Sequence, residues 1–202
     1  MKKIILAAII SLTFTATQSF GLGVILMDNY NSFNQNGGPV ITYGPGGAGP
    51  AGTGLGSTWT AGLYYALGDV RGSIAHDFAG YADPSTLGGG LTLALGPGST
   101  AQFDVFGTAG EFAASQTFQI NDNPGDTITA MVVAYDGADY STSLNRGHSD
   151  AFIMTTSVIN DPSPHLVGDY MPGFSVPIPE PATLVFAGLG LAGVLALRRK
   201  TA

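Results

Sequence analysis

The chain has 202 residues, of which 45% are hydrophobic and only 10% are charged, with 30 glycines, 12 prolines and no cysteine. This composition disfavours a helical bundle or a coiled coil, and the missing cysteine excludes disulfides, thiolate metal sites and a cysteine nucleophile. Between the basic chain ends lie two basic and thirteen acidic residues, so the body has a formal charge of −11. Such a body lacks the basic patch that binds nucleic acid.

Residues 1–21 have the three parts of a secretory signal peptide. Lys2 and Lys3 precede the apolar stretch 4–12, which small and polar residues follow. The apolar stretch is too short to cross a bilayer, which needs about 20 residues. We therefore expect export, with cleavage after Ser19 or Gly21; the alternative is a retained amphipathic anchor.

Residues 22–161 are expected to form one all-β domain, a single antiparallel β-sandwich. Short runs rich in β-branched and aromatic residues are separated by Gly, Pro, Asn and Asp, and no long segment has helical periodicity. Strands are expected at residues 23–29, 39–43, 59–67, 90–95, 101–106, 116–121, 126–135 and 152–159.

Residues 127–135 give the clearest strand. Alternate residues face opposite sides of a strand, and both sets are apolar over most of this segment. The segment is therefore expected to be a central strand. The preceding residues, 123–126, have the Pro and Gly of a turn.

Residues 44–56 are rich in glycine and are expected to form a long surface loop. Gly44, Gly46 and Gly49 match the dinucleotide-binding spacing by count, but no helix follows to hold a pyrophosphate. Trp59, which follows the loop, is the preferred candidate for an exposed aromatic that contacts a glycan.

Two acidic turns are the candidate metal sites. Carboxylate and amide oxygens are the ligands that calcium requires, although no EF-hand register is present. The alternative is that these side chains only stabilise turns through their own backbone. The candidate calcium ligands are Asp122, Asn123, Asp126, Asp136 and Asp139.

Residues 147–151 read Gly-His-Ser-Asp-Ala, one residue short of the nucleophile elbow of hydrolases. That elbow needs a strand, a turn and a helix, whereas a strand is expected to follow here. We expect a polar turn and no enzyme activity. His76, His148 and His165 lack the spacing of a helical zinc pair.

Residues 162–178 carry several prolines and are expected to be a stalk. After it come Pro179, Glu180 and Pro181, the uncharged segment 182–197, and the basic residues Arg198, Arg199 and Lys200. The uncharged segment predicts a transmembrane helix of about 24 Å at 1.5 Å per residue, somewhat short for a hydrocarbon core of about 30 Å. The basic residues favour a cytoplasmic C-terminus.

The order Pro-Glu-Pro, apolar helix and basic stop in residues 179–202 resembles the PEP-CTERM sorting signal of Gram-negative bacteria. The resemblance implies an exosortase-type processing enzyme as partner and a membrane anchor before processing. It further implies display at the cell surface or in the extracellular matrix. Segments 61–66, 131–136 and 146–152 look like strands of other small all-β exported proteins with this tail. A plain membrane anchor that is never cut is the alternative.

The expected function is a structural or adhesive role in an exported protein, with exopolysaccharide as a candidate partner and no cofactor other than a candidate calcium ion. The first alternative is a calcium- or carbohydrate-binding module. The second is a hydrolase-like enzyme that uses Ser149.

Overall fold

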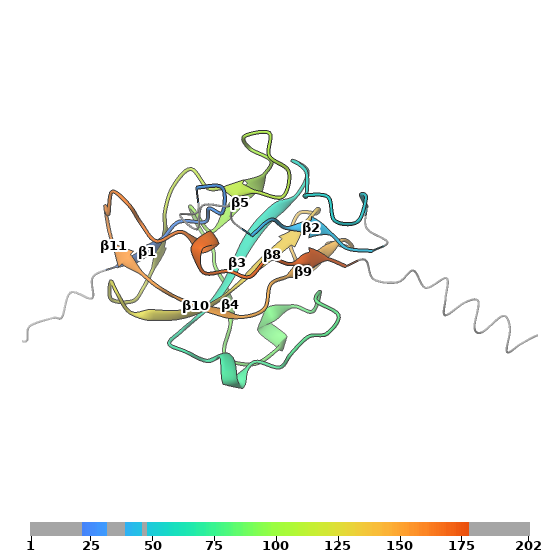
Figure 1. Ribbon diagram of the computed structural model, residues 1–202. Coiled ribbons are helices and arrows are strands. Elements are labelled where there is room, and N and C mark those ends of the chain that lie inside the picture. Colours follow the sequence, from blue (N-terminus) through green and yellow to red (C-terminus); the bar gives the residue numbers. More distant parts are fainter. Residues whose placement is uncertain (1–21, 32–38, 46–47, 178–202) are drawn as a thin grey trace, which may run out of the picture.

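The computed structural model describes residues 22–31, 39–45 and 48–177, which contain twelve β-strands and three short 3-10 helices (Figure 1). The predicted signal peptide and the predicted membrane helix at 182–197 lie outside these residues. Within the described part, no helix is long and apolar enough to cross a membrane.

Two long strands form the centre of the largest sheet. β3 (Thr60–Leu67) pairs antiparallel with β8 (Thr127–Tyr135) along its whole length. The other edge of β8 pairs with β10 (Phe152–Thr155) and β9 (Arg146–His148). The prediction of a central strand at 127–135 is therefore confirmed.

The seven-stranded sheet continues on the far side of β3. There β5 (Thr100–Phe103) pairs with β3, β6 (Phe112–Ala113) pairs with β5, and β4 (Thr92–Leu93) pairs with the second half of β3. β5 ends earlier than predicted because Asp104 has a φ of 57°, a left-handed conformation that does not continue a strand.

A second sheet contains β11 (Ser157–Val158), β1 (Gly23–Ile25) and β7 (Phe118–Ile120). The single strand predicted at 152–159 is therefore two strands in two sheets. They meet at Thr156, whose backbone N–H donates to the Asp126 carbonyl. A Cβ on Gly23 would lie 2.6 Å from Oγ1 of Thr156, so glycine is needed where β1 passes Thr156.

The third sheet is a parallel pair, β2 (Thr42–Tyr43) with β12 (Ser175–Val176). The all-β class is thus confirmed for the described residues, which contain no α-helix. The single antiparallel sandwich stays a prediction, since the described strands form sheets of seven, three and two strands and one pair is parallel.

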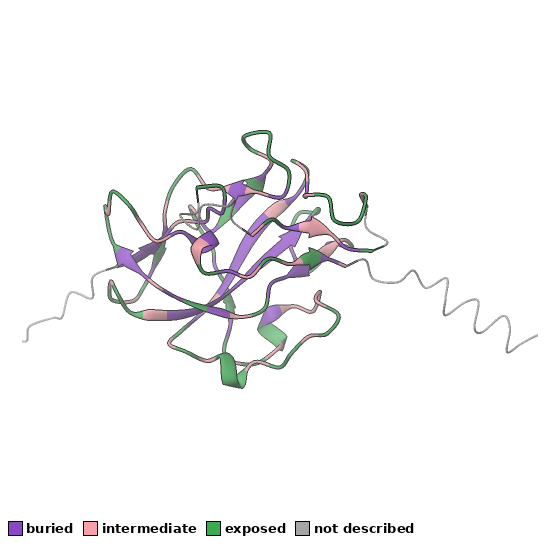
Figure 2. Cartoon of the chain, in the orientation of Figure 1, coloured by how far each residue is buried: buried purple, intermediate pink, exposed green. Residues whose placement is uncertain are grey.

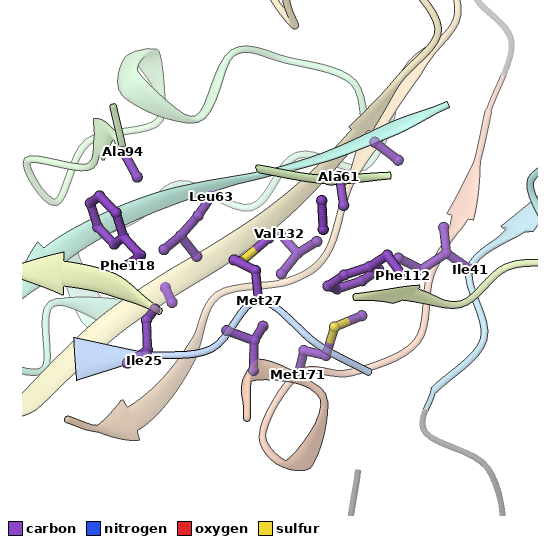
Figure 3. Close-up of a cluster of buried hydrophobic side chains, with 14 of the residues drawn as sticks. Ile25, Met27, Ile41, Ala61, Leu63, Ala94, Phe112, Phe118, Val132 and Met171 are labelled. Carbon is purple, nitrogen blue, oxygen red and sulfur yellow. The ribbon is translucent and has the colours of Figure 1, made fainter. Parts of the chain in front are cut away.

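One hydrophobic core joins the sheets (Figure 3). Ile25 of β1 and Phe118 of β7 belong to the same buried cluster as Leu63 of β3 and Val132 of β8. Figure 2 shows that β3 and β8 are buried along most of their length. The core therefore lies on the face of the large sheet that the second sheet covers.

The opposite face of the large sheet is covered by residues 68–91, drawn in teal and green below the sheet in Figure 1. This segment contains η1 (Arg71–Ser73) and η2 (Pro84–Thr86). Its Leu91 packs in a second buried cluster with Tyr64 and Met131. This covering segment explains why β8 is buried on both faces.

The segment predicted as a stalk packs against the body as far as residue 177. Leu166, Val167 and Met171 are buried, and Val176 lies in β12 beside β2. A Cβ on Gly168 would lie 2.4 Å from Cα of Asn29, which shows how closely this segment approaches the chain that follows β1. The expected end of the domain at residue 161 is therefore corrected, because the apolar residues between the prolines enter the core. Residue 178 lies outside the described range.

Candidate functional site

A cleft of about 220 Å³ opens on the face of the large sheet that residues 68–91 cover. Its floor is mainly apolar: it contains Met131 of β8, Ile74 and Leu87 from the covering segment, and Ala151 from the turn before β10. The buried His148 and the little-exposed Asp77 also line it. Met131 points this way because odd-numbered residues of β8 face away from the main core.

Charged and polar side chains form the rim of the cleft. Asp150 and His76 lie opposite each other, with 3.7 Å between Oδ1 and Nδ1. Arg71 completes the rim, and its guanidinium is engaged by Asp69 through bonds of 3.0 and 2.9 Å. The hydrogen bond from Arg71 lowers the pKa of the exposed Asp69 carboxyl below its usual range.

Phe78 lies beside this rim and is 93% exposed. Its ring centroid is 4.4 Å from that of His76, and the two rings meet edge to face at 79°. Such an arrangement is favourable for aromatic pairs. The site thus combines an apolar floor, a polar rim and an exposed aromatic ring.

The carboxylate of Asp77, whose side chain is 13% exposed, fixes the loop that carries His76 and Phe78. Asp77 accepts hydrogen bonds from the backbone N–H groups of Ala79, Tyr81 and Ala82, and its Oδ2 lies 3.1 Å from Nε2 of His148. Burial raises the pKa of Asp77, but the hydrogen bonds outweigh it, so the pKa of this carboxyl lies below its ordinary value.

This pKa shift predicts a loss of stability in acid. Because the folded pKa of Asp77 lies below the unfolded value, its contribution is present above about pH 4 and is lost as the pH falls through the folded pKa. We expect Asp77→Asn to lower the free energy of unfolding at neutral pH and to make its decline on acidification shallower. Urea unfolding at several pH values checks this; an equally steep decline in both proteins would contradict it.

Arg146 holds the neighbouring loops together. Its guanidinium donates to the carbonyls of Tyr81, at 3.1 Å, and Tyr140, at 3.0 Å, and also to that of Ser141. The guanidinium carbon lies 5.4 Å from the centroid of the Tyr140 ring. The buried Tyr140 hydroxyl donates to the Ala82 carbonyl at 3.2 Å, and burial raises its pKa. The end of the Asp77 loop, at Tyr81 and Ala82, is therefore tied to β9 and to the turn after β8.

Ser149, the residue of the hydrolase hypothesis, is fully buried. Its Oγ accepts a hydrogen bond from the Val132 N–H at 3.0 Å. Nδ1 of His148 lies 2.9 Å from the Ser149 carbonyl oxygen. An activated nucleophile needs a base within reach of its hydroxyl, and the described bonds of Ser149 instead fix the turn between β9 and β10.

The candidate calcium ligands lie in two separate places. Asp122, Asn123 and Asp126 precede β8, whereas Asp136 and Asp139 follow it. The nine residues of β8 span about 30 Å at about 3.3 Å per residue, so the two groups cannot share one ion. In the described part of the chain, no group of three His, Cys, Asp or Glu residues is placed to hold a metal.

The carboxylates of both turns bond to their own loops. Asp122 Oδ1 accepts from the Asn123 N–H, and Asp139 Oδ1 accepts from the Ser141 hydroxyl and the Thr142 N–H. Asp136 Oδ2 accepts from the Asn145 amide. These are the turn-forming contacts that were the alternative to calcium binding.

Trp59, the aromatic residue favoured for glycan contact, is buried: it is 2% exposed, and its Nε1 donates to the Tyr43 hydroxyl at 3.0 Å. That expectation was wrong, because the glycine-rich loop before Trp59 does not lift it out of the core. Of the predicted loop 44–56, residues 48–53 are largely exposed, whereas Gly44 and Leu55 are buried. Phe78 is the most exposed aromatic ring of the described residues, and nothing in the local sequence distinguishes it from a core residue.

Residues 177–200 match a family model, the PEP-CTERM protein-sorting motif. No curated protein and no solved structure matches the chain. The match begins directly after β12, which ends at Val176. The predicted sorting residues Pro179, Glu180 and Pro181 and the predicted basic stop, Arg198 to Lys200, fall inside the match.

Proposed function

We propose, from the premise that this chain is an exported PEP-CTERM protein sorted by an exosortase-type enzyme, that it has a structural or adhesive role at the cell surface or in the extracellular matrix. Residues 1–21 act as its signal peptide, and the apolar segment 182–197 holds it in the membrane until the tail is removed. The sorting step displays the all-β body, for which we keep the predicted sandwich architecture as part of the proposal.

The observation that carries this proposal is the position of the sorting motif. The folded body extends to Val176, which is buried in the pairing of β12 with β2, and the motif match begins at the next residue. Only Pro177 and Ile178 separate β12 from the Pro-Glu-Pro sequence. Removal of the tail after this point leaves every described strand intact, so the product is a complete domain.

The intact mass of the protein recovered from the envelope and the medium of its host tests the proposal. We expect a species that has lost residues 1–19 or 1–21 and the apolar tail, with an end near Pro179. Added mass on this species would indicate attached glycan or lipid and would support display in the matrix. A species that still ends at Ala202 would contradict sorting by removal of the tail.

The second candidate is a carbohydrate-binding module, which the cleft beside Phe78 favours. A cleft with an apolar floor and a few convergent polar groups is typical of small-molecule sites. Calcium binding has less support, since the candidate ligands lie at opposite ends of β8. Both candidates are compatible with an exported protein that contacts exopolysaccharide.

A further inference from the structure

We propose that the cleft above Met131 binds one neutral pyranose unit of a polysaccharide, with Phe78 as the ring on which the sugar stacks. This inference deepens the second candidate function and rests on the proposed function only in taking an extracellular glycan as the partner. Three features of the molecule support it: the size of the cleft, the charge at its rim and the position of Phe78.

The size of the cleft suits a single sugar ring. Its volume of about 220 Å³ is below the roughly 300–1,000 Å³ of sites for drug-sized ligands. The floor of Ile74, Leu87 and Met131 offers an apolar surface to the C–H face of the ring. The rim above it carries Asp150 and His76, whose polar atoms can bond to hydroxyl groups. A pyranose has this same division into apolar faces and a polar edge.

The charge at the rim favours a neutral sugar over an acidic one. Arg71 is the only basic side chain at the rim besides the histidines, and Asp69 neutralises it through two hydrogen bonds. Asp150 and Asp77 add negative charge. The body as a whole has a formal charge of −11. Uronic acids and phosphorylated sugars are therefore repelled, whereas a neutral sugar can donate hydroxyl protons to Asp150.

The backbone beside Phe78 is held in place before any ligand binds. The loop after it is fixed by the three backbone N–H groups that donate to Asp77, and its ring contacts His76 at the rim. An aromatic ring that is 93% exposed on such a fixed loop offers a flat face at little cost in entropy. Phe78 does not itself line the cleft but contacts His76, which does, and the other large exposed apolar side chains of the described chain do not line it.

Electrophoresis of the full chain, in mild detergent, through native gels that contain a polysaccharide tests the proposal. The neutral probes are dextran, galactomannan and xyloglucan, and the acidic probes are alginate and polygalacturonate. We expect at least one neutral probe to retard the protein and neither acidic probe to do so. Phe78→Ala should weaken the retarding interaction about tenfold, the loss expected from one aromatic contact, and Asp150→Asn should also weaken it.

Phe106→Ala is the matched control. Phe106 is also an exposed phenylalanine in contact with an aromatic ring, that of Tyr30 at 4.6 Å, but it does not border the cleft. We expect this variant to be retarded like the wild type, and both variants to unfold like the wild type because both rings are exposed.

Three results would overturn the proposal: no retardation by any neutral probe, retardation that survives Phe78→Ala, or a preference for an acidic probe. Each leaves the sorting proposal intact, because sorting is read from the intact mass of the native protein. A chain that keeps its tail but binds a neutral polysaccharide would instead contradict sorting and support the cleft.

Discussion

Replacing Asn29 with alanine should lower the free energy of unfolding by roughly 3 kcal/mol. Asn29 is fully buried and connects three segments of the backbone. Its Nδ2 donates to the carbonyls of Pro39, at 3.0 Å, and Gly110, at 3.4 Å, and its Oδ1 accepts from the Phe112 N–H at 2.6 Å. Alanine removes the partner of the Pro39 carbonyl and of the Phe112 N–H, whereas the Gly110 carbonyl keeps its bond from the Ile41 N–H at 3.0 Å. A buried polar group that loses its partner costs about 1–3 kcal/mol.

Trp59 provides the measurement. It is the only tryptophan of the chain and is 2% exposed, so its fluorescence reports the unfolding of the core. In urea, Asn29→Ala should unfold at a clearly lower midpoint with an unchanged dependence on denaturant. Asn29→Asp should also be destabilised, because it loses the amide donor and places a second carboxyl beside the buried Asp28.

Asn145→Ala is the control for this experiment. Asn145 also bonds through its side-chain amide, to Asp136 at 2.6 Å, but this contact is exposed. Its loss should change the free energy of unfolding by no more than about 0.5 kcal/mol. If Asn29→Ala unfolded at the same urea concentration as Asn145→Ala, the three bonds of Asn29 would not be needed to hold the segments together.

The second large effect concerns the sorting motif. Glu180→Ala should lower the processed fraction of the protein in its host about tenfold or more, so that the recovered protein keeps the mass of its tail. A hydrogen bond to a charged group contributes about 1.5–3 kcal/mol, and about 1.4 kcal/mol corresponds to a factor of ten. Glu180 is the one acidic residue outside the body, which makes it the natural carboxylate for recognition.

The matched control is Asp126→Ala, which removes an exposed carboxylate from the turn before β8 and leaves the motif unchanged. We expect normal processing of this variant. Both variants should unfold in urea like the wild type, since neither replaces a buried residue of the described body. Normal removal of the tail from Glu180→Ala would contradict recognition through the Pro-Glu-Pro sequence.

Features that depend only on residues adjacent in the chain, such as a short motif, a strand or a turn, were predictable from the sequence. The sorting motif occupies one short segment, and the family match at 177–200 covers it. The strand at 127–135 has apolar residues on both faces, and the structure shows it between β3 and the strands β9 and β10. The turn before it has Gly125 at a φ of 86°, a conformation that glycine adopts without strain.

The tertiary structure alone decided which side chains are exposed and which meet. β6 and β12 are only two residues long, too short for any periodicity, and they exist because neighbouring segments supply their hydrogen-bond partners. Apolar residues 166–176 read as a stalk until their burial is known.

The candidate site depends on the tertiary structure in the same way. Asp77 and His148 are 71 residues apart in the chain, and they meet because residues 68–91 fold over the outer face of β8. Residues 68–91 also form part of the wall of the cleft above Met131 and leave Phe78 exposed outside the cleft. Trp59, by contrast, is buried in the main core. The sequence by itself determined the sorting tail, the β class and the central strand, since these depend on local pattern. Burial and contact depend on which distant segment covers each face of a sheet, and only the folded chain decides that.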